Sequence, residues 1–116
     1  MKDLITYTDF DKLDLRIGTI VAATAPTWSK KLLRFEVDFG QELGMRIIFS
    51  GIKAYYPPDF FVGKQFAFII NLAPKKMGDE ESQGMMIMAD GVSQEGEEKP
   101  VVFSLTETVA PGTIVR

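Results

Sequence analysis

The stretch GMRIIFSGIKAYYPPDFFVGKQFAFIIN, residues 44–71, decides the fold. Near its two ends are runs of β-branched and aromatic side chains, residues 45–51 and 65–71, that are typical of strands. Between them, Pro58 suits a first helical turn, Asp59 favours the positive end of that turn, and a glycine after the aromatic pair can end it. The stretch therefore predicts a strand, a short helix and a second strand, in that order.

Three further segments have strand patterns. Residues 15–25 are rich in β-branched side chains and end at Pro26, which has no N–H to donate to a ladder. In residues 33–39, apolar and charged side chains alternate, as they do when one face of a sheet is buried and the other is wet. Residues 85–89 supply the fifth strand. Near the N-terminus, TDFDKLD predicts a helical turn capped by Thr8.

Five short strands with a helix between the third and the fourth is the element order of an OB-fold, a partly open Greek-key barrel. We therefore expect one all-β domain over residues 1–116, with a barrel core over about residues 10–90 and a C-terminal extension over residues 91–116. Strand periodicity alone would also suit a small sandwich. In OB-folds the second and third strands and the loops after the first and fourth form the binding face.

The composition excludes several kinds of site. The 116 residues include no cysteine and no histidine, which rules out disulfides, zinc sites built on thiolates or imidazoles, and Cys or His nucleophiles. Nothing indicates a cofactor or a catalytic pair, so we expect a protein that is not an enzyme. The N-terminus carries four aspartates without a signal-like apolar core, and no apolar run approaches the roughly 18 residues of a membrane span. The expected location is the cytoplasm.

The net charge of −3 conceals a segregation along the chain. Residues 28–77 carry eight basic and four acidic side chains, whereas residues 78–116 carry two basic and eight acidic ones. The positive surplus falls on the elements of the expected binding face. It indicates a polyanionic ligand, and the acidic tail could fold back onto that face and inhibit binding.

The residues around the fourth strand also carry a family resemblance. SGIKAYYPPDFFVGKQFAFIINLAPKKM, followed by ESQGMMIMAD, resembles the tRNA-binding domain that is appended to methionyl-tRNA synthetases and also occurs as a free-standing structure-specific tRNA-binding protein. The family's motifs Ser-Gly, Tyr, Gly-Lys, Asn-Leu-x-Pro-x-Lys-Met and Ser-x-Gly-Met fall at Ser50, Gly51, Tyr56, Gly63, Lys64, Asn71, Leu72, Pro74, Lys76, Met77, Ser82, Gly84 and Met85. The ending APGTIVR is similar to the Pro-Gly-x-x-Ile/Val-Arg terminus of these domains.

The resemblance implies an OB-fold that dimerises through its N- and C-terminal extensions. It also implies binding to the elbow region of tRNA by shape, alone or together with a methionyl-tRNA synthetase. One loop departs from the family pattern, because KKMGDEES stands where the family usually has Lys-Met-Arg-Gly-x-x-Ser. The missing arginine and the added carboxylates should lower the affinity of this loop for phosphate.

The candidate tRNA-binding residues lie on the expected face and in these motifs. Lys75 and Lys76 are expected to contact phosphates, or else to be solvated charges beside the acidic turn. Asn71 and Ser82 can brace the loop by bonding to its backbone, which is compatible with RNA contact. Trp28 could stack on an unpaired base or close one end of the barrel. The full candidate set is Trp28, Lys30, Lys31, Arg34, Arg46, Ser50, Lys53, Asn71, Lys75, Lys76, Met77, Ser82 and Met85.

Other interpretations remain open. DFDKLDLRIGTIVAA and the spacing from Pro26 to DFGQELG are similar to a sister family of dimeric, secretion-related chaperones with the same fold, in which an apolar, methionine-rich surface would hold unfolded polypeptides. A small-ligand site or an enzyme has only the general support that barrel mouths form pockets. Asp79, Glu80 and Glu81 could bind magnesium, but consecutive acids in a turn are usually solvated, and we expect them to tune or limit the affinity for RNA.

Overall fold

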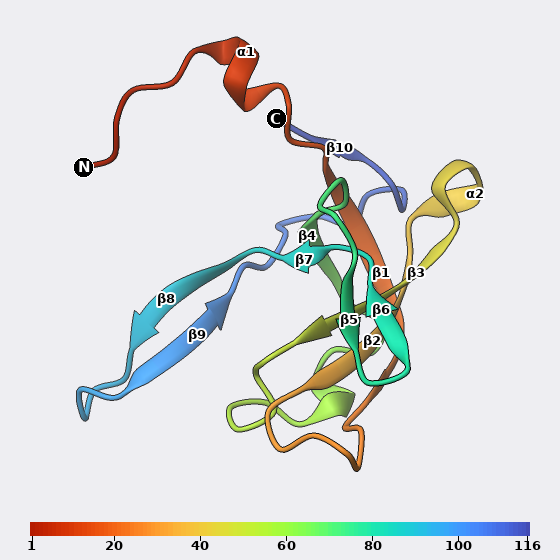
Figure 1. Cartoon of the computed structure of the whole chain (residues 1–116), viewed down its shortest axis with the longest axis vertical. Coiled ribbons are helices and arrows are strands. Elements are labelled where there is room, and N and C mark those ends of the chain that lie inside the picture. The colour runs from red at the N-terminus through yellow and green to blue at the C-terminus, as the bar shows by residue number, and fades with distance from the viewer.

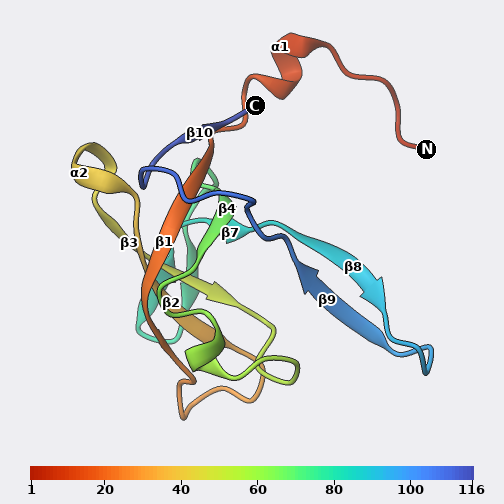
Figure 2. The same ribbon diagram turned by 180° about the vertical axis from the view of Figure 1, so that it is seen from behind.

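The computed structural model describes all 116 residues and shows a small antiparallel β-barrel (Figures 1 and 2). The barrel sheet has the strand order β3-β2-β1-β4-β7, with β10 added beside β1. Its strands are β1 (Leu15–Thr24), β2 (Leu33–Asp38), β3 (Met45–Ser50), β4 (Gln65–Ile69), β7 (Met85–Met86) and β10 (Ile114–Val115). Two separate hairpins are β5 (Lys75–Met77) with β6 (Glu80–Ser82), and β8 (Met88–Val92) with β9 (Glu98–Val102). The expected all-β, five-stranded barrel is confirmed.

The first strand, β1, joins the two sides of the barrel. Residues 15–19 pair with β4, and residues 19–24 pair with β2. The register shifts between Ile20 and Ala22, which marks an irregularity of the kind that lets a strand bend from one partner to the next. Because the same strand belongs to both sides, the sheet curls towards closure.

The barrel closes between β3 and the segment that links β6 to β7. The Ile47 N–H donates to Gln83 Oε1 at 2.9 Å, and the Gln83 N–H donates to the Ile47 carbonyl oxygen at 2.8 Å. Beside this pair, Arg46 Nη1 donates to the carbonyl oxygens of Ile70 at 2.7 Å and Gln83 at 3.2 Å. These bonds, most of which involve the side chains of Gln83 and Arg46, therefore close the barrel at a place where no regular strand ladder forms.

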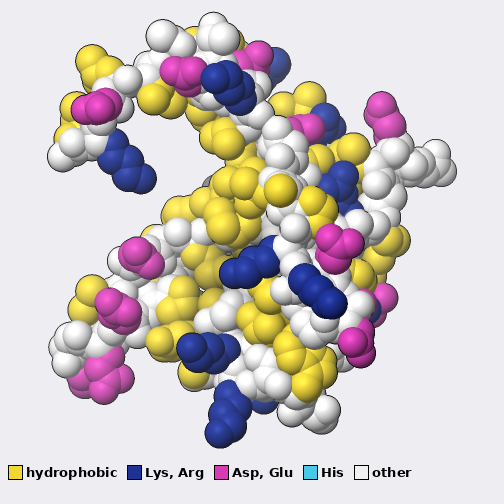
Figure 3. Space-filling model, in the orientation of Figure 1, with side chains coloured by type: hydrophobic (Ala, Val, Ile, Leu, Met, Phe, Trp, Pro, Cys, Tyr) yellow, Lys and Arg dark blue, Asp and Glu magenta, His cyan; other side chains and the backbone are white.

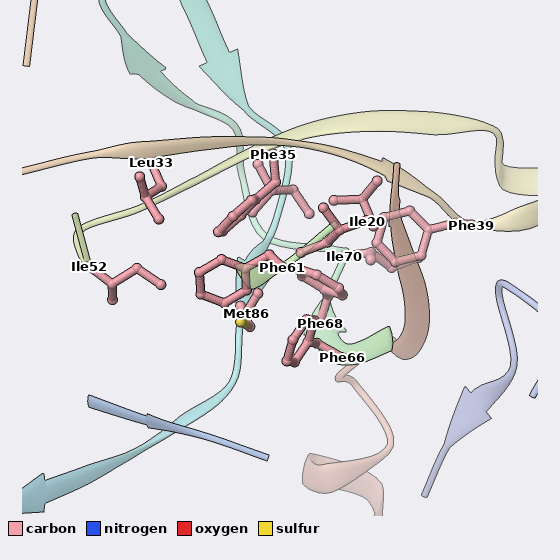
Figure 4. Close-up of a cluster of buried hydrophobic side chains, with 12 residues drawn as sticks. Ile20, Leu33, Phe35, Phe39, Ile52, Phe61, Phe66, Phe68, Ile70 and Met86 are labelled. Carbon is pink, nitrogen blue, oxygen red and sulfur yellow. The ribbon is translucent and has the colours of Figure 1, made fainter. Parts of the chain in front are cut away.

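Apolar side chains from the inner faces of the strands fill the barrel (Figure 4). On β2, apolar and charged side chains alternate along the strand. Leu33, Phe35 and Val37 point into the barrel and are fully buried, while the charged residues between them reach the surface. Phe61 follows the short helix η1 (Pro58–Phe60) and packs on Phe35 with 4.8 Å between ring centroids. The core comprises Ile20, Leu33, Phe35, Val37, Phe39, Ile48, Ile52, Phe61, Phe66, Phe68, Ile70 and Met86. The residue that follows the helix between β3 and β4 is thus a central core residue.

The helices differ in detail from the sequence-based expectations. The helix between β3 and β4 is present as a 3-10 turn of three residues. The N-terminal helix α1 (Tyr7–Phe10) is capped by Thr6, not by Thr8, because Thr6 has an extended backbone and its Oγ1 accepts the Asp9 N–H at 3.2 Å. An additional short helix, α2 (Gly40–Leu43), connects β2 to β3. None of these helices is long and apolar enough to span a membrane.

The expected fifth strand, residues 85–89, is divided at Ile87. Its first part, β7, pairs with β4, whereas β8 turns away to pair with β9. The β8–β9 hairpin projects from the barrel as a separate arm (Figures 1 and 2). The contact with β4 ends at Ile87, whose N–H donates to the Ala67 carbonyl oxygen at 3.0 Å.

The C-terminal residues run back along the barrel. Gln65 holds this segment by two bonds, since Gln65 Nε2 donates to the Val109 carbonyl oxygen at 2.7 Å and the Val109 N–H donates to Gln65 Oε1 at 3.0 Å. Beyond this point β10 pairs with Leu15 and Arg16 of β1. Residues 109–115 are therefore bonded to β1 and to the Gln65 side chain, while Glu95, Glu97 and Glu98 of the acidic tail lie on the β8–β9 hairpin.

Candidate nucleic-acid interface

A groove of about 910 Å³ lies between the end of β3, the β5–β6 hairpin and the base of the β8–β9 arm. Five of the candidate residues line it, namely Ser50, Lys75, Met77, Ser82 and Met85. Most of the other lining residues are apolar, among them Phe49, Ile52, Leu72, Met86, Met88 and Pro100. The fold thus brings segments from four parts of the chain to one concave surface with lysine on its edge.

The β5–β6 hairpin, which carries Lys75 and Lys76, is fixed to the free edge of β3. Ser82 is only 6% exposed, and its Oγ accepts the Phe49 N–H at 3.0 Å and donates to the Gly84 carbonyl oxygen at 3.2 Å. This hydroxyl satisfies a strand N–H that would otherwise lack a partner. Ser82 therefore braces the base of the hairpin, and both lysines remain exposed on its first strand.

Trp28 packs against the tip of the same hairpin. Its indole lies over Gly78, where an added Cβ would come within 2.9 Å of Trp28 Cζ2, and its ring centroid is 6.0 Å from that of Phe49. Gly78 has a φ of +62°, a conformation that glycine adopts readily. Because Trp28 remains 55% exposed, it supports the hairpin while much of its surface is open to a ligand.

Arg34 on β2 is held by Glu80 on β6. Arg34 Nε donates to Glu80 Oε1 at 2.7 Å and Arg34 Nη2 donates to Oε2 at 2.9 Å, while a carboxylate oxygen of Glu36 lies 3.4 Å from Nη1. The hydrogen bonds with Arg34 hold the pKa of Glu80 below its usual value, and those with Glu80 raise the pKa of Arg34. In this conformation the guanidinium is engaged within the protein.

Three other candidates also have structural partners. Lys53 Nζ donates to the Ser29 carbonyl oxygen at 3.2 Å and so ties the β1–β2 loop to the segment after β3. Asn71 Oδ1 accepts the Asp14 N–H at 2.8 Å, and Asn71 Nδ2 donates to the Lys12 carbonyl oxygen at 2.7 Å. Asn71 thus fastens the N-terminal segment to the end of β4. Arg46 makes the bonds that close the barrel, as described above. Lys53, Asn71 and Arg46 therefore hold the loops and strands of the candidate surface in place.

The exposed lysines form the part of the candidate set that is free to reach a ligand. Lys30 and Lys31 lie in the β1–β2 loop, and Lys75 and Lys76 lie on β5. Trp28 links these two places, because it lies in that loop and touches the hairpin tip. Figure 3 shows basic side chains over the barrel side of the molecule and acidic ones along the β8–β9 arm. No group of three or more acidic side chains is arranged to hold a metal ion.

Two important residues are absent from the sequence-based set. Glu80 engages Arg34 from 46 positions away, and Gln83 closes the barrel on Ile47 from 36 positions away. Neither has a local pattern that distinguishes it from a solvated loop residue. Only the bonds of β6 and its following segment to the edge of β3 and to Arg34 of β2 place them at these contacts.

Comparisons with known proteins agree on one family. Residues 15–114 match the family model described as "Putative tRNA binding domain". The methionine–tRNA ligase of Methanococcoides burtonii is 44% identical over 114 residues, which cover 98% of this chain. The same alignment covers 16% of the ligase, so the chain spans a small part of the curated relatives that it matches.

Two solved structures share the fold over nearly the whole chain. A MetRS-related protein from Pyrococcus horikoshii superposes with a TM-score of 0.83 at 34% identity, covering 99% of this chain and 100% of that one. The chaperone CsaA from Bacillus anthracis superposes with a TM-score of 0.80 at 30% identity, covering 98% and 100% of the two chains. One barrel architecture is therefore present in proteins described in two different ways.

Proposed function

Because the chain belongs to the family of tRNA-binding domains, we propose that it binds tRNA by shape, through phosphate contacts, and catalyses no reaction. The observation that carries this proposal is the rigid attachment of a lysine-bearing hairpin to the edge of a concave groove. Phosphate contacts from fixed lysines orient a nucleic acid without reading its bases. The exposed lysines of the β1–β2 loop would extend the same contact surface.

The decisive experiment is a fluorescence-anisotropy titration of labelled total tRNA at several salt concentrations. Unfolded single-stranded RNA of equal length serves as the competitor. Binding that weakens steeply with salt and resists the single strand supports recognition of tRNA by shape, because neutralised phosphates release counterions. Absence of binding at low salt would refute the proposal.

The lysines of the hairpin can be tested by charge removal. Exchanging Lys75 and Lys76 together for alanine should weaken binding and reduce the salt slope by up to about two units, one for each lost phosphate contact. A matched control exchanges Lys2 and Lys99, which lie outside the groove and carry the same total charge. Equal effects of the two double variants would remove Lys75 and Lys76 from the interface.

We also propose that the chain raises the tRNA affinity of a methionyl-tRNA synthetase, as an appended domain or as a separate subunit. The matched ligase contains a segment 44% identical to this chain as 16% of its length, which supports the first arrangement. Two modules that hold one tRNA slow its dissociation, because release then requires both contacts to open. Adding the protein to a synthetase that lacks such a domain should lower the measured KM for tRNA, with kcat unchanged.

Dimerisation through the terminal extensions belongs to the same proposal. The N-terminal arm leaves the barrel at the end where β10 pairs with β1 (Figure 1). Its apolar side chains and that of the last strand are exposed, namely Leu4, Ile5, Tyr7, Leu13 and Ile114. A second copy could bury this surface. Light scattering should report a dimer, and Leu4→Asp combined with Ile5→Asp should yield a monomer.

A second candidate function is the holding of unfolded polypeptides. It is favoured by the similarity to the chaperone CsaA and by the apolar walls of the groove. This function predicts binding with weak salt dependence and competition by apolar peptides. Failure of tRNA to bind, together with suppression of aggregation of an unfolded test protein, would favour it.

A further inference from the structure

We propose that Glu80 is an internal competitor for phosphate, whose carboxylate occupies Arg34 in the free protein and is displaced by a phosphate of bound tRNA. The proposal rests on the proposed tRNA binding and identifies which acid of the loop limits it. It makes Arg34 a further phosphate-binding residue, one that acts only after the exchange. The ligand class is the phosphodiester of a folded RNA.

Arg34 and Glu80 meet through two parallel hydrogen bonds, the geometry that a guanidinium adopts with an oxyanion. Two nitrogens of Arg34 donate to the two oxygens of Glu80, at 2.7 and 2.9 Å. Arginine binds two oxygens of a phosphate through the same fork of donors, so one anion can replace the other without moving the guanidinium. Glu36, 3.4 Å from Nη1, would remain in place and keep the arginine oriented.

The pair is accessible enough to exchange. The Arg34 side chain is 25% exposed and that of Glu80 is 40% exposed. At this exposure water and salt can reach and screen the pair, so a phosphate presented at the right place can compete with the carboxylate. A tRNA held by surrounding lysines presents its phosphates at a high effective concentration, whereas free phosphate does not.

The position of the pair lies within the proposed contact surface. Arg34 is on β2, next in the barrel to β3, and Glu80 is on the hairpin that carries the exposed lysines. Glu80 lies opposite Met77 in that hairpin and is partly buried, while the next residue, Glu81, lies opposite Lys76 and is exposed. Two adjacent carboxylates of equal charge therefore differ in burial and in cross-strand neighbour, and Glu80 alone of the two is bonded to Arg34.

This difference supplies a matched pair of variants for the tRNA titration. Glu80→Gln and Glu81→Gln each remove one negative charge from the same strand. Glu80→Gln should bind tRNA about tenfold more tightly and steepen the salt slope by about 0.9, since one more phosphate is neutralised. Glu81→Gln should bring a smaller gain in affinity with an unchanged slope. Equal gains and slopes for the two variants would overturn the proposal.

Arg34 is tested by repeating both substitutions in an Arg34→Gln background. There the advantage of Glu80→Gln over Glu81→Gln should disappear, because no guanidinium is left to release. A persistent advantage would mean that Glu80 acts by another route and would overturn the proposal. Circular dichroism of each variant verifies that the barrel remains folded.

A measurement on the unmodified protein avoids any loosening of the hairpin by mutation. The Nε–H resonance of Arg34 in a ¹⁵N NMR spectrum should shift when tRNA is added, as its acceptor changes from carboxylate to phosphate. An unshifted resonance in the saturated complex would overturn the proposal while leaving tRNA binding intact. Absence of tRNA binding by the unmodified protein would instead overturn both proposals.

Discussion

The two hairpins of this protein are held in different ways, although both are two-stranded antiparallel ribbons. The β5–β6 hairpin lies on the barrel and is bonded to it by Ser82 and Glu80, with Trp28 against its tip. The β8–β9 hairpin projects, and near its base the Tyr56 hydroxyl donates to the Pro100 carbonyl oxygen at 2.8 Å. Because isolated hairpins are marginal in water, side-chain contacts and not strand length decide which one is fixed. The fixed hairpin has the shorter strands, three residues against five.

The two hairpins also differ in the charge of their side chains. The fixed hairpin presents Lys75 and Lys76, while the turn region of the projecting one carries Glu95, Glu97 and Glu98. The hairpin that carries these lysines is bonded to the barrel, so less of its backbone has to become ordered when a ligand binds. The glutamates in the turn region of the arm are absent from the groove lining, whereas Asp90 near its base lines the groove. The comparison therefore indicates that rigidity is placed where the proposed ligand is contacted.

The largest contrast between the hairpins is expected for glycine substitutions. Gly84, beside the fixed hairpin, has a φ of +149°, and an added Cβ would lie 2.7 Å from the Ile69 carbonyl oxygen. Gly84→Ala should therefore lower the free energy of unfolding by about 3 kcal/mol. Gly96, in the turn of the projecting hairpin, has open space around it, so Gly96→Ala should cost about 1 kcal/mol from its φ alone. Urea denaturation measures both, and equal values would contradict the contrast.

A smaller effect is expected from removing one hydroxyl in each hairpin. Ser82→Ala leaves the buried Phe49 N–H without its acceptor and should destabilise the barrel by about 1–3 kcal/mol. Ser93, whose exposed Oγ accepts the Glu97 N–H at 3.1 Å, is the matched control. Water can replace that bond, so Ser93→Ala should change stability by about 0.5 kcal/mol or less. Thermal melts compare the two, and a greater loss for Ser93→Ala would show that the projecting hairpin is the better anchored one.

The attachment of the fixed hairpin should depend on pH. The folded pKa of Glu80 is lowered by Arg34, so the stabilisation by this pair is fully present above the ordinary carboxyl pKa of 4.5. It is lost as the pH falls through the lower folded value, because protonation removes the charge. The difference in urea midpoint between the unmodified protein and Glu80→Gln should therefore shrink below pH 4.5. A difference that stays constant down to about pH 2 would mean that the ion pair adds nothing to stability.

The smallest effect is expected at the turn of the projecting hairpin. Glu95→Gln combined with Glu97→Gln changes two exposed charges without removing a side-chain bond. The free energy of unfolding should stay within about 0.5 kcal/mol of the unmodified value. A larger change, measured by urea denaturation, would show that the acidic arm contacts another part of the molecule.

Much of the barrel could be predicted from the sequence because its signals are local. Alternation in residues 33–39 specified which side chains of β2 are buried, and Pro58 marked the short helix between β3 and β4. The β5–β6 hairpin could not be predicted in this way. Its strands are short and largely polar, and the contacts that hold them come from Phe49 and Arg34, which lie far away in the chain.

The candidate site was predictable as a region but not as a set of free side chains. The motifs led to residues that line one groove, including Ser50, Ser82 and Met85. The sequence could not indicate that Arg34 is bonded to Glu80 or that Arg46 bonds to carbonyl oxygens. Both outcomes depend on which residues the closing barrel brings opposite each arginine, and local patterns of charge contain no such information.

The pairing of β10 with β1 has a consequence for synthesis on the ribosome. Leu15 pairs with Val115, so the edge of β1 at its first residues finds its final partner about 100 residues later. At typical rates of translation this delay is roughly 5–20 s, during which a strand edge is open to other chains. A nascent chain of this protein should therefore depend on chaperones early in elongation, and that dependence should end when residues 114–115 leave the exit tunnel.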